Sequence, residues 1–196
     1  MRQYLKSRLW THLTSEFLGQ IQVRYHYEEK DRAQLKLVAA DMANCMKWQE
    51  STYLVWQEST PGQVVVVMTL GIGIDLLQER YAKSGRMMES YMVESIAGEL
   101  LMLGYAQLEQ FIREKMRYYV SAYHFFGSEE AYPLEAMKGI LEQTRQSNVI
   151  CNEAGCLTPK KSVVFLAELT KQENSACGQL CDTCAARTDC DHAKNN

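Results

Sequence analysis

The spacing of apolar residues alternates along this chain between helical and extended periods. Near-helical intervals predict a first amphipathic helix over residues 4–21, marked by Leu5, Leu9, Leu13 and Phe17. A second helix is predicted over residues 28–49, because its apolar residues also follow a helical period. Its expected buried side consists of Leu35, Leu37, Val38, Met42 and Met46.

Two extended runs follow these helices. Residues 53–58 and 63–68 are rich in β-branched and aromatic side chains, which is typical of strands. Between them, Pro61 and Gly62 supply turn chemistry, because proline fixes φ and glycine tolerates positive φ. We therefore predict a β-hairpin.

Helical spacing returns after Thr69 and continues through a long helix predicted over residues 87–119. We expect a loop over residues 123–133 and a further helix over residues 134–146, with Pro133 suited to its first turn. Two last strands are predicted at residues 148–152 and 162–169, and we expect the second of them to lie beside the buried strand at residues 64–68.

Helices and strands do not alternate regularly here, so the predicted fold class is α+β, a mostly antiparallel sheet packed with helices. We expect three parts. Residues 1–50 are predicted to be a helical N-terminal segment and residues 51–170 an α+β core. Residues 171–196 are a cysteine-rich tail, the only segment that composition sets apart.

The tail holds four of the seven cysteines of this 196-residue chain, in the run CGQLCDTCAARTDC. Thiolates this close in sequence can surround one metal centre, either a zinc ion or an iron–sulfur cluster, and the spacing favours neither. Disulfides are the alternative if the protein is exported. The predicted metal ligands are Cys177, Cys181, Cys184 and Cys190.

Three further features bear on the setting of the protein. The first residues contain no apolar stretch of signal-peptide length, and the run at residues 64–68 is too short to span a bilayer. We therefore expect a cytoplasmic protein, in which clustered cysteines indicate metal binding before disulfides. The net charge of −3 gives no indication of nucleic-acid binding, and we expect no membrane partner.

Several segments after residue 60 together resemble a known family. The strand-turn-helix VVVVMTLGIGID, the helix ESYMVESIA and the segment NEAGCLTPKKSV occur in the order and at the separations found in the activation domain of cobalamin-dependent methionine synthase, in its stand-alone bacterial versions. The tail is similar to the cysteine clusters of stand-alone members from anaerobes. The first fifty residues match weakly.

This resemblance implies a methionine synthase activation domain-like fold and a role with corrinoids. The family domain binds S-adenosylmethionine and presents its methyl group to an inactive cobalamin held by a partner, a corrinoid protein or methyltransferase. The chain would then be an accessory domain of a methyltransferase system rather than an independent catalyst. An iron–sulfur centre in the tail would supply an electron locally, whereas zinc would be structural.

The ligand motif of the family, Arg-x-x-x-Gly-Tyr, is altered at residues 127–132. Gly127 stands at the arginine position, Ala131 at the glycine position, and Tyr132 is retained. An arginine there would pair with the ligand carboxylate. The resemblance leaves Tyr132, Glu129, Glu130 and Glu153 as candidate ligand residues.

The long helix is also expected to present a carboxylate to the ligand, with Glu94 and Glu99 as candidates. Two function classes remain open. The first is a corrinoid-associated activation module that uses S-adenosylmethionine. The second is a metal-cluster protein on the same fold, acting in electron transfer or as a partner-binding scaffold without that ligand.

The metal assignment gives a first prediction. Replacing Cys181 with serine should remove the bound metal and leave residues 1–170 folded, because the core elements lie upstream of the tail. Metal analysis and circular dichroism of anaerobically purified protein check this. Unchanged metal content in the variant would show that the ligands lie elsewhere.

Overall fold

A computed structural model describes residues 2–48, 51–57 and 62–173. Its centre is a five-stranded antiparallel sheet, which confirms the α+β class. A two-stranded hairpin, β5 (Ile150–Cys151) with β6 (Leu157–Thr158), lies apart from this sheet. In spatial order the sheet contains β1 (Arg2–Ser7), β2 (Ser51–Gln57), β3 (Gln63–Thr69), β7 (Ser162–Thr170) and β4 (Tyr119–Phe125).

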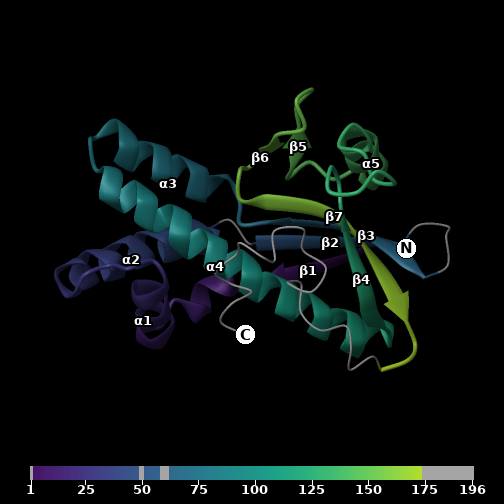
Figure 1. Ribbon diagram of the computed structural model, residues 1–196, viewed down its shortest axis with the longest axis horizontal. Coiled ribbons are helices and arrows are strands. Elements are labelled where there is room, and N and C mark those ends of the chain that lie inside the picture. The colour runs from purple at the N-terminus through teal and green to yellow at the C-terminus, as the bar shows by residue number, and fades with distance from the viewer. Residues whose placement is uncertain (1, 49–50, 58–61, 174–196) are drawn as a thin grey trace.

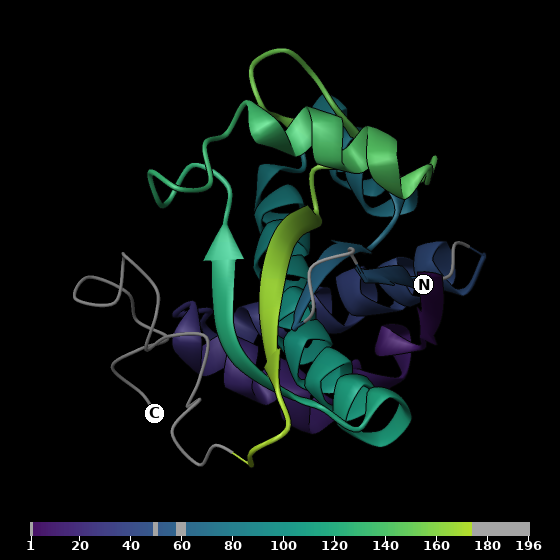
Figure 2. The ribbon, with the colours of Figure 1, turned by 90° about the vertical axis from the view of Figure 1, so that its right-hand side faces the viewer.

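Helices cover both faces of the sheet. Figure 1 shows α5 and the hairpin above the strands and α4 running beneath them, and Figure 2 shows α5 across the end of β7 and β4. The helices are η1 (Leu9–His12), α1 (Ser15–Arg24), η2 (Glu29–Asp31), α2 (Arg32–Trp48), α3 (Ile72–Lys83), α4 (Met87–Phe111), η3 (Ile112–Met116) and α5 (Ala136–Thr144).

Strand β3 pairs with β7 in the register Val66↔Phe165, which confirms the predicted neighbours. Successive side chains of a strand point to opposite faces. Val66 therefore faces the larger core, with Phe165 and the α1–α4 helices, while Val65 faces a smaller core under α5. Because both faces are covered, β3 is buried along almost its whole length.

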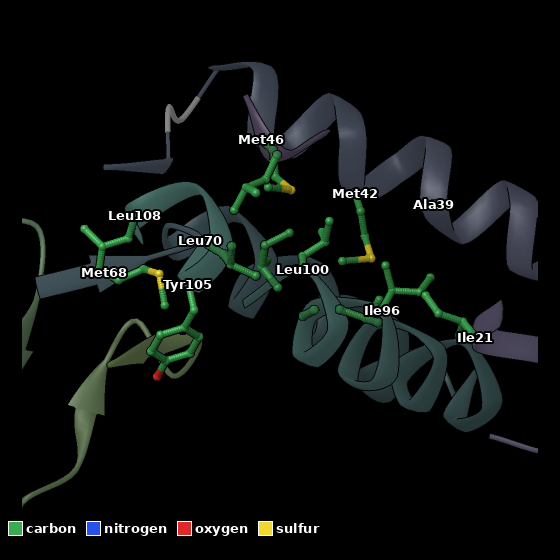
Figure 3. Close-up of a cluster of buried hydrophobic side chains, with 14 of the residues drawn as sticks. Ile21, Ala39, Met42, Met46, Met68, Leu70, Ile96, Leu100, Tyr105 and Leu108 are labelled. Atoms are coloured by element: carbon green, nitrogen blue, oxygen red, sulfur yellow. The ribbon is translucent and has the colours of Figure 1, made fainter. Parts of the chain in front are cut away.

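The larger core joins distant parts of the chain. Figure 3 shows Ile21 and Met42 from the first two helices packed near Ile96 and Leu100 of α4, with Met68 of β3 further along. The first fifty residues thus share a core with the segment that follows. The division of the chain at residues 50 and 170 stays a prediction.

The predicted helix over residues 4–21 is wrong in its first part. Residues 2–7 form β1, which pairs antiparallel with β2. Helix α1 begins only at Ser15, where the hydroxyl of Thr14 caps it by accepting a hydrogen bond from the Phe17 amide at 3.2 Å. Pairing at the sheet edge overrides a helical spacing that four apolar residues produce by coincidence.

The second helix is confirmed, with one face assignment corrected. Leu35, Val38 and Met42 are buried, but Leu37 is 61% exposed. Residues two positions apart on a helix point to opposite sides, so Leu35 and Leu37 cannot both face the core.

The long helix ends earlier than predicted. Helix α4 stops at Phe111, one wide turn forms η3, and Arg117 reverses the chain at φ 61°. The region expected to be helix and then loop contains the edge strand β4 instead. A register shift between Val120 and Ala122 interrupts the alternation of inward and outward side chains along β4. The sequence therefore lacks the two-residue period that would have predicted a strand here.

The hairpin of β2 and β3 and the helices α3 and α5 confirm the remaining predictions. The strand expected at residues 148–152 is reduced to the two residues of β5, and its partner β6 was not predicted.

Candidate ligand site

The loop that follows β4 contains the motif-like residues 127–132. The amide of Gly127 donates to the carbonyl of Tyr132 at 2.8 Å, and the amide of Tyr132 donates to the carbonyl of Glu129 at 3.0 Å. The ring of Tyr132 stacks on the imidazole of His124, with centroids 4.6 Å apart. The loop is therefore closed on itself and fixed to the edge strand. It lies between β4 and α5, not directly after the long helix.

His124 on β4 lies between two carboxylates. Its Nδ1 is 3.0 Å from Glu129 Oε1, and its Nε2 is 3.2 Å from Glu168 Oε1 on β7. The second contact has the distance of an ion pair without the alignment of a hydrogen bond. A ligand at Glu129 would therefore have to compete with His124 for this carboxylate. Sequence reasoning missed His124, since neither partner is at a spacing that marks a site.

Glu130 differs from its neighbour. Its side chain is exposed and makes no hydrogen bond or ion pair with the other residues that the structure describes. The structure therefore separates the two predicted glutamates: Glu129 is held by His124, and Glu130 faces solvent.

The second motif-like segment is the turn between β5 and β6. The Asn152 side-chain oxygen accepts hydrogen bonds from the amides of Ala154 at 3.0 Å and Cys156 at 2.8 Å, which closes the turn. Glu153 lies at its tip, 88% exposed, and forms an ion pair with Lys138 of α5. The hydrogen bond from Lys138 lowers the pKa of Glu153, so this carboxylate is charged at neutral pH.

Leu134 brings the two segments together. A Cβ added to Gly155 would lie 2.6 Å from its Cδ2, and one added to Gly127 would lie 3.4 Å from its Cβ. The side chain of Leu134 is therefore packed between the loop and the turn. Beside it lies a hollow of about 280 Å³, lined by Leu134, Glu135, Lys138, Cys151, Asn152, Glu153, Ala154 and Gly155.

The backbone at position 127 favours glycine over residues that have a side chain. Gly127 has a φ of 84°, a backbone conformation that residues other than glycine rarely adopt. An arginine there would be strained by this backbone conformation, although its Cβ would make only ordinary contact with Leu134. The backbone of the loop therefore favours glycine at position 127.

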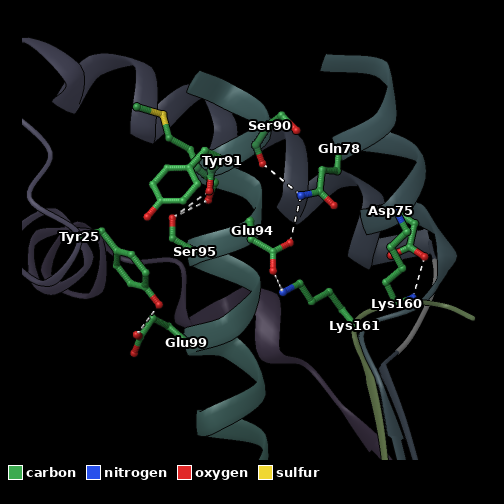
Figure 4. Close-up of polar contacts among 11 residues, drawn as sticks. Tyr25, Asp75, Gln78, Ser90, Tyr91, Glu94, Ser95, Glu99, Lys160 and Lys161 are labelled. Atoms are coloured by element: carbon green, nitrogen blue, oxygen red, sulfur yellow. Dashed lines mark hydrogen bonds and ion pairs between the residues drawn. The ribbon is translucent and has the colours of Figure 1, made fainter. Parts of the chain in front are cut away.

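The two candidate carboxylates of α4, Glu94 and Glu99, both pair with side chains of neighbouring segments (Figure 4). Glu94 accepts a hydrogen bond from Gln78 of α3 at 3.0 Å and pairs with Lys161 at the start of β7. Glu99 accepts from Tyr25 at 3.1 Å and pairs with Arg24 at 3.2 Å. Neither glutamate lines the hollow, and both tie α4 to neighbouring elements.

Their environments shift two pKa values. Burial acts to raise the pKa of Glu94, but the hydrogen bonds from Lys161 and Gln78 outweigh it, so the pKa lies below its usual value. For Tyr25, burial and the charge of Glu99 both raise the pKa, so the phenol stays protonated and continues to donate to Glu99.

The predicted metal ligands Cys177, Cys181, Cys184 and Cys190 lie outside the described residues. Within the described ranges, no three histidine, cysteine or acidic side chains come together as metal ligands. Cys151 is half-buried in the wall of the hollow. Burial and then the charge of Cys156 raise the pKa of its thiol, which makes it a poor nucleophile.

The comparisons with known proteins give no family. No protein-family model matches this chain, and a search of curated proteins found no match. In the described ranges, no helix is long and apolar enough to cross a membrane.

The Glu94 contacts give a prediction of pH dependence. A carboxylate with a lowered folded pKa stabilises the protein above its unfolded pKa, and this contribution is lost as pH falls. Glu94→Gln should therefore reduce stability at pH 7 and lose this deficit between about pH 5 and pH 3. Urea unfolding of the variant and the unaltered protein at pH 7 and at pH 3 measures this deficit. Glu130→Gln, which removes an exposed charge, is the control. A deficit that persists unchanged at pH 3 would contradict the assignment.

Proposed function

We propose that this chain is a corrinoid-associated activation module that supports reductive methylation of an inactive cobalamin with S-adenosylmethionine. The observation that carries the proposal is the meeting of residues 127–132 and the turn at residues 152–156 around Leu134, beside the hollow. These two segments are far apart in sequence, and they are the ones that resemble the ligand-binding parts of the family.

The hollow offers charges that match the ligand. S-adenosylmethionine carries a carboxylate, an ammonium group and a sulfonium. Lys138 can meet the carboxylate in place of the missing arginine, and Glu135 and Glu153 can meet the two cationic groups. Tyr132 does not line the hollow, but its stacking on His124 holds the loop from which Leu134 enters it. In this proposal Tyr132 therefore positions the site rather than contacting the ligand.

The methyl transfer itself belongs to the ligand and the corrinoid. Cobalamin bound to a partner supplies a cobalt that accepts the methyl group together with one electron. The role of this chain is to bind the donor and to orient its methyl group toward the partner. It acts as part of a methyltransferase system rather than alone.

The four tail cysteines suit a metal centre by the chemistry of their donor set. Four thiolates complete the tetrahedral coordination of zinc or hold one four-iron cluster. In the proposed function a cluster would supply an electron to the corrinoid, and zinc would be structural. Absorption near about 400 nm in anaerobically purified protein distinguishes iron–sulfur from zinc.

One observation favours the second candidate function, a metal-cluster protein that transfers electrons or holds a partner without this ligand. The backbone at Gly127 excludes the arginine of the family motif, and Lys138 is already paired with Glu153. A ligand carboxylate must then compete with Glu153 for Lys138, which weakens binding.

Anaerobic calorimetry of the full chain with S-adenosylmethionine separates the two candidates. Without the arginine, which would contribute about 1.5–3 kcal/mol, we expect binding roughly ten- to a hundredfold weaker than a site that has it. Lys138→Met and Tyr132→Ala should each weaken binding by about tenfold further. Tyr91→Ala, which removes a half-exposed tyrosine from α4, serves as the control.

Two results would contradict the proposal. Absence of heat at millimolar ligand would favour the second candidate. Tight binding that is indifferent to both Lys138→Met and Tyr132→Ala would show that the ligand lies elsewhere.

A further inference from the structure

A group of exposed cationic side chains lies where the chain leaves the described fold. Arg113 and Lys115 are on η3, Arg117 follows it, and Lys171 follows β7. The ammonium of Lys171 lies 5.9 Å from the centre of the Tyr118 ring, so the two chain stretches are adjacent. We call these four residues the basic end.

The basic end is not neutralised by the described part of the chain. The nearest acidic residues in sequence are Glu114, which accepts a hydrogen bond from Gln110 at 2.8 Å, and Glu173, which is exposed. Within the described ranges, none of the four cations has a carboxylate at ion-pair distance. Four cations against these two carboxylates leave a net charge of +2 at the basic end, so a negative group placed there would be attracted to it.

The position of the cysteines in sequence limits where their metal centre can be. Cys177 is four residues beyond Glu173, the last described residue. An extended chain spans at most about 3.6 Å per residue, so the Cα atom of Cys177 lies within roughly 14 Å of that of Glu173. Glu173 in turn is two residues from Lys171 of the basic end.

The charge of such a centre complements the basic end. Cysteine ligands bind as thiolates, and four of them outnumber the two positive charges of a zinc ion. A four-iron cluster with four thiolates is likewise an anion when its core carries two positive charges. The centre therefore keeps a net negative charge in either form.

We propose that the basic end is the docking surface for the metal-loaded C-terminal segment, residues 174–196, with Cys177, Cys181, Cys184 and Cys190 as ligands. The inference rests on this cysteine centre and not on S-adenosylmethionine binding. Arg113, Lys115, Arg117 and Lys171 stabilise the thiolate charge through space.

Zinc competition against a chelator tests this with the full chain. The test variant carries Lys115→Glu with Lys171→Glu. The control carries Lys36→Glu with Arg80→Glu, the same charge change on α2 and α3, which Figure 1 shows at the other end of α4. Cys181→Ser gives the background from other thiols.

We expect the test variant to bind zinc about five- to tenfold more weakly at low ionic strength, and less than about twofold more weakly near 1 M salt, because salt screens exposed charges. The control should stay within about twofold of the unaltered protein under both conditions. Zinc should also slow amide exchange at residues 112–120 in the unaltered protein and less so in the test variant.

Equal affinities of the test variant and the unaltered protein, with equal protection at residues 112–120, would overturn the proposal. So would an equal loss in the control, which would indicate net charge rather than a local surface. A chain that binds no zinc through Cys181 would also overturn it. Calorimetry with S-adenosylmethionine tests the ligand proposal independently. A negative result in the zinc experiment therefore does not contradict S-adenosylmethionine binding.

Discussion

The antiparallel pairing of β3 with β7 is the constraint on which the rest of the structure depends. It divides the apolar side chains into two cores, one with the α1–α4 helices and one under α5. At its end, the hydroxyl of Ser162 donates to that of Thr69 at 2.8 Å, and the amide of Leu70 donates to the carbonyl of Lys161 at 2.9 Å. The Lys160 amide also donates to Asp75 of α3 at 2.7 Å. These contacts fix the chain that leads from the β5–β6 hairpin into the sheet, and so position the turn that carries Glu153.

The candidate site depends on packing more than on charge. Leu134 is held between Gly127 and Gly155, and both glycines have positive φ. A side chain at position 155 would push Leu134 away from the turn, because its Cβ would overlap the leucine side chain. The charged groups of the hollow, Lys138 and Glu153, pair with each other across this junction. In the proposed function, a ligand that enters would have to exchange that ion pair for its own charges, which would lower its affinity.

Local pattern predicted the elements that are buried along their length. The unbroken apolar run of β3 and the regular three-and-four spacing of α3 and α4 are visible in sequence, because burial alone selects those residues. Strand β1 was mistaken for helix because its role comes from pairing with β2. Within the site, Tyr132 and Glu153 are predicted as ligand residues by the family resemblance alone, whereas nothing in the sequence indicates a role for His124. Its partner Glu168 is distant in sequence, and only the β4–β7 register brings the two together.

The central claim is that this chain supports methylation of an inactive corrinoid, and transfer of a labelled methyl group tests it most directly. Full-length protein would be incubated anaerobically with cob(II)alamin, a one-electron reductant and S-adenosylmethionine labelled in its methyl group. The methyl cation of the sulfonium, the cobalt(II) and one electron together give methylcobalamin and S-adenosylhomocysteine. We expect labelled methylcobalamin to form faster with the chain than without it, and Lys138→Met to reduce the gain. Formation at the protein-free rate, by a chain shown to hold its metal, would contradict the account.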